Sequence, residues 1–307
     1  MPEYSGVLPL YKPAGMTSHD VVGAVRRLYH TPRVGHTGTL DPMATGVLVL
    51  LVGRAAKATE YLTAGKKAYR AVLRLGLTTD TEDITGKTLS TCAVIPPAKR
   101  VIAAAKGFEG EIMQTPPMYS ALKVNGQKLV DLARRGVEVE RAPRPVTIYS
   151  LSCAPLDAAP LDGASTDYAL DVVCSAGTYI RTLCADIGRT LGCGGAMAAL
   201  ERTETGGFSL DEAVTLERLE SMDEAERAAL LRPVEALFAD LAAVLLPAFF
   251  EKLARSGCEI YQKKIGACFD VGTRVRLCDA DGRFFALGEV REYADGTAIK
   301  SIKLFDI

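Results

Sequence analysis

One short stretch of the sequence brings together several side chains that could do chemistry. Residues 35–46 read Gly-His-Thr-Gly-Thr-Leu-Asp-Pro-Met-Ala-Thr-Gly and place His36 and Asp41 in a polar segment before an apolar run. An ionised Asp41 could act as a nucleophile or stabilise a positive charge on a reacting group. A simpler alternative is that Asp41 caps a helix beginning at Pro42, because Asp is a good N-cap and proline suits the first helical position.

Several common functional sites are not indicated by the sequence. The glycines of this stretch are not part of a Gly-x-x-x-x-Gly-Lys-Ser/Thr loop, and residues 192–195 do not complete a Gly-x-Gly-x-x-Gly fingerprint. The eight cysteines form no Cys-x-x-Cys pair, and the three histidines all lie in the first 36 residues. We therefore expect no metal site and reduced thiols.

The elements around the polar segment must hold it in place. Strands are predicted at 7–10, 47–52, 68–75, 146–153 and 168–174, from short apolar or alternating runs. Helices are predicted at 18–30, 55–63, 97–106, 179–191, 210–219 and 223–231. Residues 31–41 and 78–88 are polar and predict loops. Because strands and helices alternate without a regular βαβ repeat, the fold class is α+β.

The pattern changes after Pro233 and Pro247. Short strands are predicted at 271–278, 284–290 and 299–305, joined by turns that contain Asp and Gly. We therefore predict a first domain at 1–246 and a small β-rich domain at 247–307.

Charge is nearly balanced over the whole chain but uneven along it. The 36 Lys and Arg residues face 37 Asp and Glu residues, a net charge of −1. Residues 54–74 contain six basic side chains and one acidic one, whereas residues 201–240 contain four basic and eleven acidic ones. One face could hold a polyanion, although ordinary solvated surfaces would give the same pattern.

The sequence predicts neither a membrane protein nor an exported one. Its longest apolar runs cover six or seven residues, such as 47–52, whereas a membrane span needs about 20. The first residues have no basic segment followed by an apolar one, so we expect no signal peptide and a cytoplasmic location.

The polar segment also resembles a known motif. Residues 35–48 are similar to the catalytic motif of the TruB family of tRNA pseudouridine-55 synthases. Other stretches resemble further motifs of that family in the same order: Lys12–Ser18, Lys67–Tyr69, Gly76–Asp83, Gln114–Arg134, Gly177–Leu183 and Leu200–Thr203. The resemblance extends from about residue 7 to residue 210. At three positions the sequence departs from the usual pattern, with Tyr11 in place of Asp, and with Ala176 and Glu201 where basic residues are frequent.

The resemblance implies a fold and a domain arrangement. Residues 1–246 would form a pseudouridine synthase core around a mixed, largely antiparallel sheet, with an RNA-clasping insertion at about 120–145. The C-terminal strands resemble a PUA-type RNA-binding domain.

The resemblance also implies roles for individual residues. Asp41 would be the catalytic carboxylate, Arg181 its partner, and Tyr69 the ring that stacks on the flipped base and takes its proton. Tyr179 and Leu200 would line the uracil pocket, and His36 would fill the space that the base leaves. Basic residues near the site would be Lys12 and Lys57, and those on RNA phosphates would be Lys123, Lys128, Arg134, Arg135, Arg141 and Arg144.

The implied activity is isomerisation of uridine 55 in the tRNA T-loop to pseudouridine. It would need no cofactor and no protein partner, and we expect a monomer that binds tRNA. One alternative is a non-catalytic tRNA-binding or tRNA-folding chaperone, which would not need Asp41. Another is a guide-RNA-dependent pseudouridine synthase, which would be inactive on bare tRNA.

Overall fold

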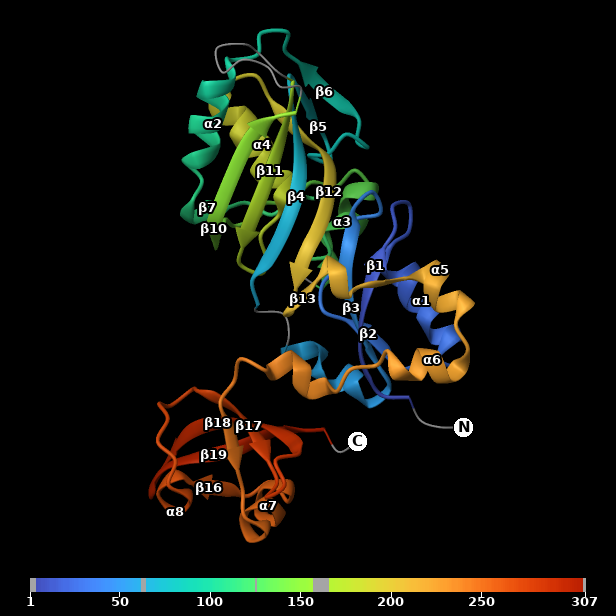
Figure 1. Cartoon of the computed structure of the whole chain (residues 1–307). Coiled ribbons are helices and arrows are strands. Elements are labelled where there is room, and N and C mark those ends of the chain that lie inside the picture. The colour runs from blue at the N-terminus through green and yellow to red at the C-terminus, as the bar shows by residue number, and fades with distance from the viewer. Residues whose placement is uncertain (1–3, 62–64, 125, 157–165, 306–307) are drawn as a thin grey trace.

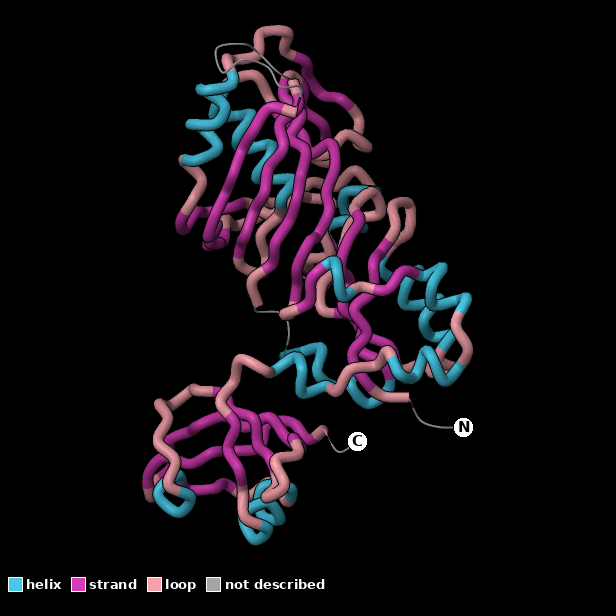
Figure 2. The backbone as a smooth tube through the Cα atoms, in the orientation of Figure 1, coloured by secondary structure: helices cyan, strands magenta, loops and turns pink. Residues whose placement is uncertain are grey.

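Two β-sheets of different size form two units of the molecule (Figure 1). The structure is a computed structural model that describes residues 4–61, 65–124, 126–156 and 166–305. The larger sheet has ten strands and the smaller one has five. Strands run through both units while short helices lie against them (Figure 2), so the α+β prediction is confirmed.

The larger sheet is mixed and mostly antiparallel. Its main path consists, in spatial order, of β14 (Val214–Thr215), β1 (Gly6–Lys12), β3 (Thr45–Val52), β12 (Gly195–Thr205), β4 (Lys67–Leu75), β11 (Asp167–Cys174), β10 (Arg144–Pro155) and β7 (Gly110–Gln114). Only the β14–β1 and β3–β12 pairs on this path are parallel. β2 (Val34–His36) adds to β3, and β13 (Phe208–Ser209) adds to β12.

Strand β3 is buried on both faces, and its side chains alternate between two clusters. Leu48 and Leu50 pack with α1 (Ser18–Leu28) on one side. Val47, Val49 and Leu51 pack with η1 (Gly53–Tyr61) on the other. The continuous apolar run is therefore what a strand covered on both faces requires.

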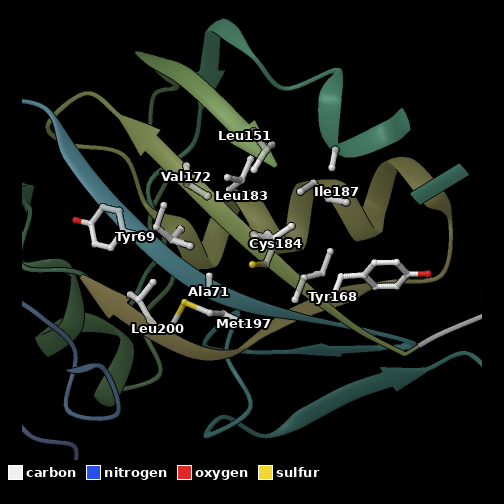
Figure 3. Packing of buried hydrophobic residues seen from close by; sticks show 14 of the residues in the cluster. Tyr69, Ala71, Leu151, Tyr168, Val172, Leu183, Cys184, Ile187, Met197 and Leu200 are labelled. Atoms are coloured by element: carbon white, nitrogen blue, oxygen red, sulfur yellow. The ribbon is translucent and has the colours of Figure 1, made fainter. Parts of the chain in front are cut away.

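The other half of the sheet is covered by α2 (Ala98–Lys106) and α4 (Ile180–Leu191). Alternate residues of β4, from Tyr69 to Leu75, face this cluster, and α4 contributes Leu183 and Ile187. Figure 3 shows Tyr69 and Leu200 at one end of the cluster, with Tyr168 toward the other. The apolar core thus ends at the residues expected to line the site.

The smaller sheet has the order β15 (Ala243–Leu245), β17 (Arg274–Cys278), β18 (Phe284–Tyr293), β19 (Gly296–Leu304) and β16 (Glu259–Tyr261). Helices α7 (Ala248–Arg255) and α8 (Gln262–Ile265) pack against it. This sheet begins at β15, a few residues before the predicted boundary at 247. Val244 packs in the small core, so the chain enters this unit before Pro247.

The apolar cluster on the η1 side of β3 also joins the two units. Phe238 of η3 (Val234–Phe238) packs against Phe284 and Phe305, with ring centroids 5.5–5.8 Å apart. The same cluster includes Val47 and the other outward residues of β3. The C-terminal unit therefore rests on the central strands of the larger sheet.

Several short elements differ from those predicted. β2 lies in the predicted loop 31–41, and β5 (Leu77–Thr79) pairs with β6 (Thr88–Thr91) across the predicted loop 78–88. The segment 55–63 is mostly the 3-10 helix η1, while residues 62 and 63 lie outside the described residues. The predicted helix 210–219 splits into η2 (Leu210–Glu212), β14 and α5 (Leu216–Ser221), followed by α6 (Glu224–Ala229). Tertiary pairing decides these short segments, because a strand of two or three residues has little periodicity of its own.

Candidate active site

The loop that carries Asp41 connects β2 to β3 and is fixed by hydrogen bonds. Ser18, in the first turn of α1, accepts from Leu40 N at 2.9 Å and donates to Leu40 O at 3.2 Å. Ala44 N donates to Asp41 O at 3.0 Å, which closes a turn that leads directly into β3. No helix begins at Pro42. The alternative that Asp41 is an N-cap is therefore wrong, because the chain after it continues as a sheet strand.

Arg181 is the immediate partner of Asp41. Its Nε lies 3.0 Å from Asp41 Oδ2, and its Nη2 lies 3.3 Å from Oδ1. The guanidinium also donates to Tyr119 O at 2.8 Å and to Thr81 O at 3.1 Å, and lies 3.7 Å from Asp83 Oδ2. The side chain is only 7% exposed, so it is held in one position rather than lying at the surface. This two-point contact orients the carboxylate as well as neutralising it.

Burial and charge act against each other at Asp41. Burial raises the pKa of this carboxyl above its ordinary value, and the Arg181 cation lowers it. Lys12 also lowers it, although the Lys12 ammonium is itself buried and donates to Pro13 O, Met16 O and Pro42 O. The ionised form of Asp41 therefore depends on the cations beside it.

Asp41 and Arg181 open onto a cavity of about 590 Å³, a size suited to a small ligand or a single nucleotide. Three more of the residues that the family resemblance singles out, Tyr69, Tyr179 and Leu200, line the same cavity. Gln114 fixes Tyr179 from behind, accepting from Tyr179 N at 2.8 Å and donating to Tyr179 O at 3.0 Å. The cavity lining thus combines the Asp41–Arg181 pair with aromatic and apolar side chains.

Tyr69 is almost completely buried in β4 and is paired in register with Arg202 of β12. Burial raises the pKa of its phenol, and the Arg202 guanidinium opposes that change. Its ring forms part of the cavity wall. A flat ring at this position can stack on a base.

Three of the residues expected near the site do not line the cavity. Lys12 is fully buried and contacts the Asp41 loop through Pro42 O, while its other two acceptors, Pro13 O and Met16 O, follow β1. His36 ends β2, where its Nδ1 accepts from Gly38 N at 3.3 Å. Lys57 lies on η1 beside two other surface hollows. Among these three, only Lys12 is placed to influence Asp41 directly.

The basic insertion forms a wall of the cavity. It contains β8 (Lys123–Val124), β9 (Gln127–Lys128) and α3 (Leu129–Arg134), and its residues Ser120–Leu122 and Val130 line the cavity. Five of its six basic side chains are exposed: Lys123, Lys128, Arg134, Arg135 and Arg144. Arg141 is half-buried and donates to Pro116 O at 3.0 Å. The exposed cations therefore lie on the segment that borders the cavity.

The structure adds polar residues for which the sequence suggested no role. Asp83 and Gln114 are buried behind Arg181 and Tyr179, and Arg202 is fully buried beside Tyr69. Lys67 lines the cavity next to Tyr69. One signal was present, because all four residues lie within stretches that resemble motifs of the family.

Two of the departures from the family pattern contact each other. Tyr11 Oη donates to Glu201 Oε1 at 3.2 Å, although the residues are 190 positions apart. Glu201 also lies 3.9 Å from Arg70. The acidic side chain at 201 is therefore accommodated by a hydroxyl donor and a cation.

Neither a metal site nor a membrane span is visible in the described part of the chain. Within it, no three His, Cys, Asp or Glu side chains are grouped to hold a metal ion. None of its helices is long and apolar enough to cross a membrane.

Comparison with known sequences gives a consistent result. Residues 26–180 match the profile described as TruB family pseudouridylate synthase (N terminal domain), and residues 181–239 match that of the tRNA pseudouridylate synthase B C-terminal domain. A tRNA pseudouridine synthase B from Alkaliphilus oremlandii is 45% identical over 84% of this chain and 83% of its own. One from Aromatoleum aromaticum is 44% identical over 92% of this chain and 88% of its own.

Solved structures share the fold over the whole chain. A chain in a Cbf5-Nop10-Gar1 complex superimposes with a TM-score of 0.74 at 26% identity, covering 99% of this chain and 85% of that chain. A chain of an H/ACA RNP bound to a substrate RNA containing 2′-deoxyuridine has a TM-score of 0.72 at 23% identity, covering 100% and 91%.

Proposed function

The chain belongs to the TruB family of pseudouridylate synthases, and we propose that it converts uridine 55 of the tRNA T-loop to pseudouridine with Asp41 as the catalytic carboxylate. Its relatives from Alkaliphilus oremlandii and Aromatoleum aromaticum carry the name tRNA pseudouridine synthase B. The enzyme is an isomerase whose substrate is tRNA.

The single observation that carries the role of Asp41 is its setting. The carboxylate is held at two points by buried Arg181, in the lining of a cavity that also presents Tyr69, Tyr179 and Leu200. An aromatic ring, an apolar wall and one oriented carboxylate suit a pyrimidine that has left its stack.

The isomerisation requires few catalytic groups besides this carboxylate. The C1′–N1 bond of uridine breaks, the uracil turns within the cavity, and C5 joins C1′. C5 loses its hydrogen as a proton and N1 gains one, so product and substrate have the same composition. Asp41 can add to C1′ or to C6, and either route requires its ionised form, which Arg181 favours.

Other residues would prepare the base for this step. Tyr69 would stack on the flipped uracil and take the C5 proton, while Tyr179 and Leu200 would hold the ring. His36 would occupy the space left in the RNA stack, and Lys12 and Lys57 would add positive charge around the site. The exposed cations of the insertion, with Arg141, would contact phosphates.

The protein would work as a monomer on bare tRNA in the cytoplasm, without a protein partner. The similar relatives named as tRNA enzymes and the basic insertion beside the cavity support tRNA as the substrate. A guide-RNA-dependent activity is the second candidate, because a chain of a Cbf5-Nop10-Gar1 complex has the same fold.

The test is release of tritium from tRNA labelled at uridine C5. Wild-type protein should release tritium from bare tRNA and not from tRNA that carries cytidine at position 55. Asp41→Asn should lower the rate by more than about a thousandfold, because the amide cannot act as a nucleophile. Asp171→Asn is the matched control, since this carboxylate is 68% exposed on β11.

The outcomes separate the candidates. Tight tRNA binding without tritium release would favour a chaperone, and release only after addition of a guide RNA would favour the guide-dependent enzyme. Full activity of Asp41→Asn would remove Asp41 from the mechanism.

A further inference from the structure

Two cations converge on one residue of the Asp41 loop that has no side chain. A Cβ added to Gly38 would lie 3.0 Å from Lys67 Nζ and 3.6 Å from Arg202 Nη1. Gly38 does not adopt the left-handed conformation that favours glycine, so it is the space and not the backbone geometry that suits a glycine here. The absence of a side chain at position 38 therefore lets the two cations lie close against the loop.

Arg202 forms the buried half of the pair. It is fully buried, and it donates from Nε to Val47 O at 2.8 Å and from Nη2 to Gly38 O at 3.1 Å. Its Nη1 has no hydrogen-bond acceptor among the described residues. Burial lowers the pKa of Arg202 and the neighbouring Tyr69 raises it, and Arg202 makes no ion pair with a carboxylate among the described residues. A positive charge thus remains uncompensated behind the cavity wall.

Lys67 forms the accessible half. It lines the cavity with Asp41 and Tyr69, and its ammonium makes no ion pair or hydrogen bond in the part of the chain that the structure describes. Burial, and next the Arg202 cation, lower the pKa of Lys67 to about 8. The charges in the cavity are therefore unequal, since Asp41 is matched by Arg181 while Lys67 has no counter-charge.

Unmatched buried cations are unfavourable unless a ligand brings the opposite charge. The proposed substrate does so, because a nucleotide turned out of its stack carries its phosphodiester toward the cavity. We propose that Lys67 and Arg202 form an anion site for a phosphodiester next to the flipped uridine. Lys67 Nζ donates to a phosphate oxygen, and Arg202 adds positive potential from behind. This inference rests on the proposed function, of which it names one substrate contact.

The test pairs a protein change with an RNA change. T-stem-loops carry an uncharged methylphosphonate at the linkage 5′ or 3′ of the target uridine, and binding is measured with Asp41→Asn protein so that the RNA is not converted. Lys67→Met should weaken binding of unmodified RNA about tenfold, as loss of a charge-assisted hydrogen bond does. At one of the two linkages the methylphosphonate should weaken binding to a similar extent, and combining both changes should cost nothing further.

Lys66→Met is the matched control. The ammonium of this neighbouring lysine is exposed and lies 4.5 Å from the ring centroid of Tyr149. Any loss of affinity in Lys66→Met should therefore be independent of the loss caused by the methylphosphonate, so that the two fold-changes multiply when both changes are combined. Independent effects of Lys67→Met at both linkages would overturn the inference. Lost isomerisation in Lys67→Met with no coupling would assign Lys67 to the uracil instead. Tritium release by the wild-type protein tests the proposed function separately.

Binding should also depend on pH through Lys67. A bound phosphate raises the pKa of Lys67, so its contribution is complete below pH about 8 and is lost as pH rises through the bound-state value. The groups that face Lys67 do not titrate in this pH range. Burial lowers the pKa of His36 and raises the pKa of Cys174 to about 11. Arg202 stays charged.

Lys67→Arg is the matched variant for this dependence. Lys67→Arg should keep the affinity for RNA and remove the loss of affinity above pH 8. Lys12 is the other amine with a pKa of about 8, and because it is present in both proteins it cannot cause a difference between them. Equal pH dependence in wild type and Lys67→Arg would contradict the contact.

Discussion

At the scale of single residues, the cavity depends on which charges have partners. The guanidinium of Arg181 is almost completely buried, and it contacts Asp41, Asp83 and two backbone carbonyls. Burial alone would favour the neutral acid at Asp41, and Arg181 is the largest influence against it. The ionisation of this carboxylate thus depends on a residue 140 positions away in the chain.

Replacing Arg181 should make activity depend more strongly on pH. In Arg181→Met the pKa of Asp41 rises further, so the ionised form is reached only at higher pH and the acid limb of the rate profile moves upward. We expect a loss of about a hundredfold at pH 7, typical of removing one electrostatic stabiliser, with partial recovery at pH 8.5. Single-turnover tritium release from pH 5.5 to 9 measures it.

Arg189→Met is the control for this variant. Arg189 lies two turns later in α4, is 72% exposed and pairs with Asp186. Its profile should match wild type. A loss in Arg181→Met that is uniform across pH would show that Arg181 acts only through the position of Asp41.

At the scale of elements, the proposed RNA-binding insertion also lines the cavity. Its cavity-lining residues and its exposed cations are only a few positions apart, for example Val130 and Arg134 on α3. In the described part of the insertion, Lys123, Lys128, Arg134 and Arg144 make no ion pair. RNA held by these cations would therefore cover the cavity.

The salt dependence of tRNA binding should report these contacts. Each phosphate contact releases counterions, so the slope of log K against log salt should fall by about 0.7–0.9 for every cation removed. Lys128→Ala with Arg134→Ala should therefore reduce the slope by about 1.4–1.8. Binding titrations between about 50 and 300 mM salt measure this slope. Arg218→Ala, an exposed cation on acidic α5, should leave the slope unchanged, and an unchanged slope in the double variant would place the RNA elsewhere.

At the scale of the whole molecule, the two units share a core. Phe305, next to the end of β19, packs with Phe238 and with the face of β3 opposite α1. Tyr61 Oη donates to Ile302 O at 3.3 Å, and Lys303 pairs with Glu60 of η1. The C-terminal unit therefore supports the strand that follows the Asp41 loop.

Removing Phe305 should destabilise the whole protein rather than the C-terminal unit alone. Phe305→Ala should lower the free energy of unfolding by about 3–5 kcal/mol, because it leaves a cavity in the shared cluster. Urea denaturation followed by fluorescence and circular dichroism measures it. Phe249→Ala, a ring that is 68% exposed, should change stability by less than about 0.5 kcal/mol. A loss confined to the C-terminal unit would contradict a shared core.

Much of the fold follows from the sequence because its longer elements carry their own periodicity. The spacing of apolar residues indicates which side of each element is buried. This holds for the apolar run of β3, for the alternation of β4 and β11, and for the helical spacing of α1, α2 and α4. Thr17 also caps α1 as its residue type predicts, in a capping box with Asp20. The family resemblance, carried by motifs in order, identified Asp41, Tyr69, Tyr179, Arg181 and Leu200, which line one cavity.

Only the tertiary structure decided which distant groups meet. Nothing local to Asp41 distinguishes a helix cap from a loop residue paired with Arg181, and nothing local to Lys67 indicates that it lacks a counter-charge. Short strands such as β2 and β14 exist only because a longer neighbour offers them hydrogen bonds. A local sequence pattern reflects only the few residues on either side of a position, whereas ionisation and burial depend on groups brought together from across the chain. The sequence by itself therefore determines the longer helices and strands. Their packing determines which side chains of the site are charged.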